Sequence, residues 1–277
     1  MDISLPVTLA VLGAALLHAS WNVLLKSGED KELETTSIAA GSGLVGLVAA
    51  LFLPAPAAAS WPWLAGSAVV HILYFVFLAG AYRWGELSYT YPVMRGGGPM
   101  IVALVGAVAL GEILPAKDTL GVALICAGIV AFASGRHDRR ATAFAIANAL
   151  VIAAYTLIDG FGARASGAPV SYTLWFFAAN GMVFVLYSVA RGRGPEIAAY
   201  FRTKWPRAVA GGALAVAAYA VALWAMTRAP IALVAVLRET SVIFAAFLST
   251  IFLHEKMTRR RLVATGAVMC GLVALKI

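Results

Sequence analysis

Charged residues are scarce in this chain. Only 12% of the 277 residues are Asp, Glu, Lys or Arg, whereas 62% are hydrophobic; an average soluble domain is about 25% charged. A soluble chain of this size would have to expose much of its apolar surface to water, but in a bilayer apolar side chains can face lipid. The composition therefore predicts an all-α integral membrane protein without a water-soluble domain.

Sequence motifs for metal, nucleotide or nucleophilic chemistry are also missing. The two cysteines, Cys126 and Cys270, lie in apolar stretches and lack the spacing of a metal or redox site. No Walker A sequence occurs, and His254-Glu255 lacks the second histidine of a zinc protease. The glycine motif at 41–46 follows no strand, so we interpret it as a small-residue packing face. We expect no catalytic residue, no metal and no cofactor.

Ten apolar blocks are long enough to cross a bilayer, which takes roughly 20 helical residues. The first has neither the basic start nor the cleavage site of a signal peptide, so we interpret it as a retained helix. The fifth and the tenth are the shortest. The blocks are 5–25, 35–53, 64–82, 87–110, 119–135, 141–163, 170–190, 208–227, 230–253 and 258–277.

An internal repeat relates the two halves of the chain. A shift of 143 residues lays 93–134 over 236–277 without a gap. Each half holds five spans, an odd number, so the second half enters the membrane from the opposite face. We therefore predict two inverted five-helix repeats, 1–135 and 136–277, which favour a transporter because such halves can rock about a central site. Matching residues include Arg95 and Arg238, Glu112 and Glu255, and Gly128 and Gly271.

The chain has ten spans in two sets of five, and a Gly-Glu or His-Glu pair follows the fourth span of each half. In these features it resembles the drug/metabolite transporter superfamily, EamA family. Within it, the chain is similar to bacterial amino-acid exporters of the YddG type. The resemblance implies a multi-pass secondary transporter of the bacterial inner membrane that exports amino acids, aromatic ones included, by alternating access. A drug, sugar or phosphonate-compound permease stays open as an alternative. The rival class is a membrane-embedded enzyme, for which we find no convergent catalytic groups.

One segment suggests how transport is driven. Residues 13–30 resemble the first helix of the small multidrug-resistance subunits, which carry an essential glutamate eight residues before a lysine at the helix end. Lys26 matches the lysine, and His18 takes the glutamate's place. Histidine titrates near neutral pH, with a pKa of about 6.5, so His18 and Asp159 are the coupling candidates and protons a candidate partner. The alternative is that His18 only bonds a neighbouring helix.

Polar residues deep in spans are candidate substrate ligands, because they are costly in lipid. Arg95 lies roughly 12 Å into the fourth span at 1.5 Å per residue, and Arg238 lies similarly deep in the ninth. The alternative is that each snorkels or pairs with carbonyls. Arginine suits a carboxylate, and an aromatic wall suits an apolar side chain. The predicted substrate-binding set is His71, Tyr74, Tyr82, Arg95, Gly98, Tyr155, Trp175, Arg238 and Glu239.

A glycine run, 96–98, follows Arg95 directly and ends at Pro99. Such a run should weaken or break the helix. A second half-helix starting near Pro99 would then offer free N–H groups to an anion. The alternative is that the glycines let neighbouring helices approach closely. We expect the cavity between the halves, lined mainly by the third, fourth, sixth and ninth spans.

Basic residues concentrate on one face. Fifteen of the 21 lysines and arginines follow odd-numbered spans (the odd face), and four follow even-numbered spans (the even face). We attribute the net charge of +8 to membrane topology and expect no nucleic-acid partner. The positive-inside rule predicts a cytoplasmic odd face with both termini outside, whereas the resemblance implies the reverse.

Overall fold

The computed structural model describes residues 3–28, 30–109, 111–134, 138–252 and 258–275, and all the regular structure within these ranges is helical. Eight helices, with α9 and α10 taken together, are long and apolar enough to cross a membrane. Two more, α5 and α11, have 15 and 16 residues; they correspond to the fifth and tenth blocks. The helices are α1 (Leu5–Ser27), α2 (Lys31–Ala50), α3 (Trp61–Trp84), α4 (Leu87–Ala109), α5 (Ala116–Val130), α6 (Arg139–Ala165), α7 (Pro169–Ala190), α8 (Gly194–Met226), α9 (Ile231–Glu239), α10 (Ser241–Phe252) and α11 (Arg259–Ala274).

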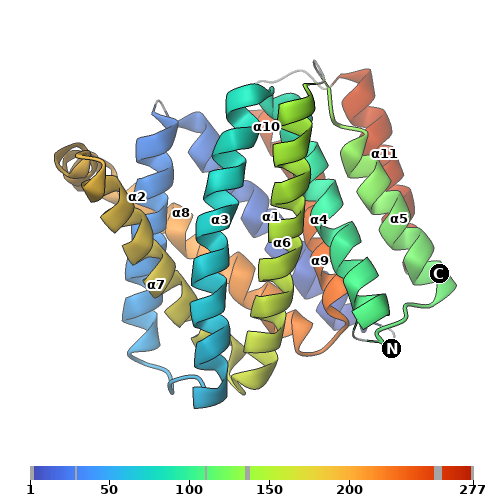
Figure 1. The fold of residues 1–277 in the computed structure, drawn as a ribbon, viewed down its shortest axis with the longest axis horizontal. Helices are drawn as coiled ribbons and strands as arrows, with labels where there is room; N and C mark the ends of the chain where they lie inside the picture. The colour runs from blue at the N-terminus through green and yellow to red at the C-terminus, as the bar shows by residue number, and fades with distance from the viewer. Residues whose placement is uncertain (1–2, 29, 110, 135–137, 253–257, 276–277) are drawn as a thin grey trace.

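Helix α8 is longer than its apolar block. The sequence predicted a loop before residue 208, but the helix begins at Gly194 and bends at Lys204, whose backbone is not helical. Pro195 occupies the first turn, where its missing N–H costs nothing. The segment 194–203 lies across the end of the bundle and is seen almost end-on at the upper left of Figure 1. The prediction missed it because a short amphipathic helix has no long apolar run.

The predicted break in the fourth span is wrong. Helix α4 runs unbroken through Pro92 and Pro99, and the glycines serve close packing instead. A Cβ at Gly96 would lie 2.7 Å from a methyl of Val130 on α5, and one at Gly98 would lie 2.6 Å from a methyl of Ile152 on α6. The interrupted span is the ninth, which is divided into α9 and α10.

Small residues bring α2 against α7 and α8, as predicted for 41–46. A Cβ at Gly41 would overlap the carbonyl of Ala208 on α8. Gly43 faces Gly181 on α7, since a Cβ on Gly43 would lie 3.1 Å from the Cα of Gly181. Figure 1 shows these three helices grouped on one side of the bundle. Their backbones are therefore in direct contact.

Helices α5 and α11 pack side by side at the opposite edge (Figure 1). A Cβ added at Gly128 would lie 2.9 Å from the backbone nitrogen of Val268, and one added at Gly271 would lie 2.8 Å from that of Ile125. Each contact is the other shifted by 143 residues. Between these edges, α3 and α4 pack on α6, while α8, α9 and α10 pack on α1.

Candidate functional site

A buried ion pair crosses the middle of the bundle. Arg95 on α4 and Glu239 on α9 are 9% and 4% exposed, and 2.8 Å separates Nε of Arg95 from Oε2 of Glu239. The sequence predicted both residues but not their pairing, because they are far apart in the chain. Removing one partner of such a pair leaves an uncompensated charge and typically costs about 3–5 kcal/mol. Each side chain therefore needs either its partner or a ligand group that carries the partner's charge.

His18 on α1 completes this cluster. Its Nε2 lies 3.4 Å from Nη2 of Arg95, and its Nδ1 lies 3.3 Å from the indole nitrogen of Trp21. Both neighbours are donors, but a neutral imidazole has only one acceptor nitrogen. His18 can therefore accept from only one of them at a time, and a second ring proton would place a positive charge beside Arg95.

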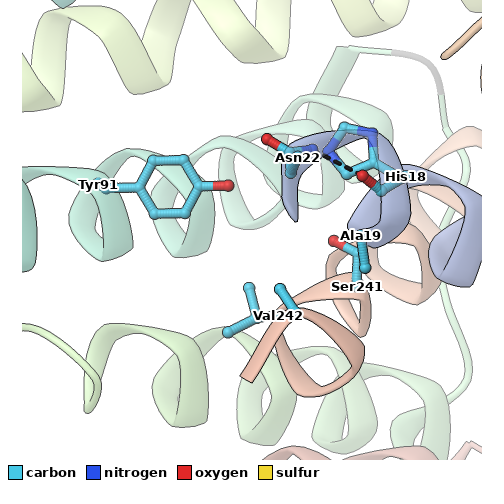
Figure 2. Close-up of a pocket in the computed structure, with 7 residues that line it drawn as sticks. His18, Ala19, Asn22, Tyr91, Ser241 and Val242 are labelled. Atoms are coloured by element: carbon cyan, nitrogen blue, oxygen red, sulfur yellow. Dashed lines mark hydrogen bonds between the residues drawn. The ribbon is translucent and has the colours of Figure 1, made fainter. Parts of the chain in front are cut away.

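A cavity of about 60 Å³ opens next to His18 (Figure 2). Figure 2 shows Tyr91 of α4 pointing toward Asn22 of α1, whose side-chain amide donates to the carbonyl of His18 at 2.7 Å. Ser241 and Val242 of α10 form the other wall. Helix α1 thus lines this cavity together with the fourth and ninth spans; α3 and α6 do not. Sites for small molecules occupy roughly 300–1,000 Å³, so this cavity is too small for an amino acid in the observed conformation.

An aromatic wall lies beside the ion pair. The rings of His71 and Tyr155 are stacked with centroids 4.4 Å apart, and Tyr74 lies 5.9 Å from Tyr155. Nδ1 of His71 donates to the carbonyl of Ser67 at 2.8 Å. Because a carbonyl only accepts, this bond fixes the proton on Nδ1 and leaves Nε2 as an acceptor. The predicted grouping of His71 and Tyr74 therefore includes Tyr155 as its centre.

Asp159 is fully buried behind this wall. Its carboxylate accepts hydrogen bonds from the hydroxyls of Tyr172, at 3.1 Å, and Tyr219, at 2.5 Å. The guanidinium of Arg238 lies over the ring of Tyr219, 5.0 Å from its centroid, a cation–π contact. Arg238 is thus linked to Asp159 through one tyrosine, so the two clusters form a continuous polar layer.

Two predicted ligands, Gly98 and Trp175, lie away from these clusters, and a third, Tyr82, lies at their edge. Gly98 faces α6 and not a cavity. Tyr82 is 38% exposed near the end of α3, close enough to Tyr91 and Arg95 to interact with them electrostatically. Trp175 packs on Trp61, with centroids 5.5 Å apart, and its indole nitrogen has no partner within the described part of the chain. The α7 ring that contacts His71 is the neighbouring Phe176.

Several residues of the layer escaped the sequence analysis, namely Asn22, Tyr91, Tyr172, Tyr219 and Ser241. All of them are polar groups inside apolar blocks, so the rule that selected His71 would also have selected them. The ionisable residues were noticed first because their cost in lipid is larger.

An arginine forms an ion pair at each end of the bundle. On the odd face, Arg207 of α8 pairs with Glu34 of α2 at 2.5 Å and bonds Ser27 of α1. On the even face, Arg164 of α6 pairs with Glu112 at 3.1 Å and donates to the carbonyl of Met226 at 2.8 Å. Each of these ion pairs therefore connects parts of the chain that are far apart in the sequence.

A multi-pass helical bundle with charged groups buried at its centre is typical of a membrane transport protein. The profile of the EamA-like transporter family matches residues 139–276. Multidrug resistance protein EbrB of Bacillus subtilis (strain 168) is 31% identical over 87 residues, which span 74% of EbrB and 30% of this chain. The chain belongs to the EamA-like transporter family, as its resemblance predicted.

One solved structure, described only as the crystal structure of a protein, has the same fold. It superposes with a TM-score of 0.76 over 98% of both chains, at 19% sequence identity. The whole chain therefore adopts a known fold, although the family profile covers its second half. The nearer likeness to amino-acid exporters of the YddG type stays a prediction.

Proposed function

We propose that the protein is a secondary transporter of the bacterial inner membrane that exports small carboxylate-bearing metabolites, amino acids and aromatic ones among them. The observation that carries this proposal is the buried pair of Arg95 and Glu239 beside the wall of His71, Tyr74 and Tyr155. A guanidinium suits a carboxylate, and the rings suit an apolar side chain. The substrate carboxylate would replace Glu239 as the partner of Arg95, with Arg238 as a second cation nearby.

Alternating access between two inverted halves, 1–135 and 136–277, is the transport mode that we propose. The reciprocal contacts of Gly128 and Gly271 support it, because each repeats the other after a shift of 143 residues. The paired indices run in opposite directions, so the two helices are antiparallel. A twofold axis in the membrane plane produces that arrangement, whereas an axis along the membrane normal would make equivalent helices parallel.

Proton coupling through His18 is the driving force that we propose, with Asp159 as the second titratable group. A proton on His18 would add a positive charge 3.4 Å from Arg95. Repulsion between the two cations would then destabilise Arg95 in its present position. Charge on His18 and an anion on Arg95 therefore influence each other, as coupled transport requires.

Export of organic cations is a second candidate, favoured by the match to Multidrug resistance protein EbrB. Asp159 and Glu239 are buried carboxylates, and the aromatic wall can bind a cation through its ring faces. In this case the carboxylates and not the arginines would hold the substrate.

Transport by purified protein in liposomes distinguishes these candidates. We expect uptake of labelled phenylalanine and other amino acids, with Arg95→Gln lowering it about tenfold to a hundredfold, the range for losing one charged hydrogen bond. Arg228→Gln, an arginine at the even face, is the matched control and should transport normally. The variant Arg95→Gln/Glu239→Gln removes both buried charges together and leaves neither unpaired, so its loss of transport with normal folding would implicate binding. Uptake of organic cations alone would overturn the amino-acid proposal.

A further inference from the structure

A second hollow, of about 770 Å³, lies outside the polar layer, where the segment 194–203 of α8 crosses α2 and α7. Its floor is apolar and includes Ala40 of α2 and Val185 of α7. Ile197 and Phe201 of the crossing segment form its other side. The volume falls within the roughly 300–1,000 Å³ of sites for small molecules. We call this hollow the α8 groove.

The α8 groove continues onto the lipid-facing surface of α7. Val189 lines the groove and is 54% exposed, and Met182 and Leu186 on the same helix are 61% and 58% exposed. Such apolar side chains are stable only against lipid. An elongated apolar group seated in the groove can therefore extend along α7 into the hydrocarbon region.

Positive charge marks one end of the groove. Arg202 lines it, and Lys204 follows at the bend of α8. Within the residues that the structure describes, neither side chain forms an ion pair or a side-chain hydrogen bond, whereas Arg193 pairs with Asp30 and Glu32. Both charges are thus available to an anionic group at the groove.

Trp205 lines the groove together with Arg202 and is 55% exposed. Tryptophan concentrates at the boundary between hydrocarbon and headgroups. An amphipathic helix with its apolar side inward and basic residues beside it is the usual form of a segment lying in that boundary. The charged end of the groove therefore lies at the depth of lipid phosphates.

We propose that the α8 groove is a binding site for an anionic phospholipid. An acyl chain lies between Ile197, Phe201 and Val185, and the phosphate lies against Arg202, which lines the groove, with the charge of Lys204 two residues further along the chain. A soluble anion lacks the apolar part that the groove accommodates, and a neutral lipid lacks the charge that the two cations require. The site is independent of the transported substrate, so its test does not depend on the proposed function.

Native mass spectrometry of the detergent-purified full chain, titrated with phosphatidylglycerol, measures this binding. We expect one preferred phosphatidylglycerol per chain, held more tightly than phosphatidylcholine. Arg202→Gln/Lys204→Gln should weaken it roughly twentyfold to thirtyfold, from the usual contribution of each basic residue at an anionic surface. Arg139→Gln/Arg228→Gln removes the same charge away from the groove and should leave binding unchanged. Ala198→Trp, which fills the groove without a change of charge, should also displace the lipid.

Inorganic phosphate at millimolar concentration tests the charge of the headgroup without an acyl chain. It should not displace phosphatidylglycerol. Equal binding of the two phospholipids would overturn the proposal, because it would indicate unspecific surface lipid. Displacement of the lipid by phosphate alone would also overturn the proposal. So would undiminished lipid binding by both the double charge variant and Ala198→Trp. Normal melting temperatures of all variants show that lost binding is not lost folding.

Discussion

His18 has hydrogen-bond donors on both sides, Trp21 at 3.3 Å and Arg95 at 3.4 Å. A single acceptor nitrogen cannot serve both, so the state of the ring depends on where Arg95 lies. This is a sharper basis for coupling than its position in the sequence, since any movement of Arg95 toward a substrate changes the bonding of His18. The coupling hypothesis thus depends on the contact between His18 and Arg95.

We predict that His18→Gln folds normally but loses the response of transport to an imposed pH gradient, because an amide does not titrate in this range. Liposomes with equal or different internal pH give the measurement. Trp21→Phe is the matched control, since it removes the neighbouring donor, keeps the imidazole and should keep the response. If His18→Gln still responds, or if the unaltered protein never does, His18 is a structural residue.

Prediction from sequence selected single polar residues inside the spans but not the pairs that they form. Arg95, Glu239 and His18 were each identified by their cost inside an apolar block. Glu239 adjoins Arg238 in the sequence, but neighbours on a helix point about 100° apart, and its partner is Arg95 on α4. Pairing across the bundle depends on helix packing, which no local pattern specifies.

At the scale of helices, apolar length predicted the positions of the membrane spans, because the bilayer sets a minimum that each helix must meet. The same criterion overlooked residues 194–203 of α8. It also gave no guidance on the glycines of α4, which suit either a broken helix or a close contact. Whether a helix breaks depends on what packs against it, and Val130 and Ile152 occupy the space beside Gly96 and Gly98.

We predict that Gly181→Ala destabilises the protein by about 1–3 kcal/mol, the usual cost of overpacking. The added Cβ would lie 2.7 Å from the Ala39 carbonyl oxygen and 2.7 Å from the Cα of Gly43. Gly66→Ala is the matched control in α3, where a Cβ meets nothing within 4 Å, and its melting temperature should be unchanged or higher because alanine favours helix. Thermal unfolding in detergent, followed by circular dichroism, makes the comparison. Equal melting temperatures would show that α2 and α7 are not in close contact.

At the scale of the whole molecule, an arginine ion pair lies at each end of the bundle, Arg207 with Glu34 on the odd face and Arg164 with Glu112 on the even face. A transporter must open one end at a time. In the alternating access that we propose, exchange of these ion pairs is the simplest route, because one joins α2 to α8 and the other joins α6 to the segment after α4.

The orientation of the whole molecule is our last prediction. Fifteen of the 21 basic residues belong to the odd face, and moving one charge across the membrane potential costs about 2.3 kcal/mol per 100 mV. We therefore predict a cytoplasmic odd face with both termini outside, against the family resemblance. In a variant whose cysteines, Cys126 and Cys270, are replaced by alanine, Ala116→Cys on the even face should react with an impermeant maleimide in intact cells. Glu86→Cys on the odd face should react only after permeabilisation. The reverse pattern would place both termini inside, and the excess of basic residues would then mark the outer surface.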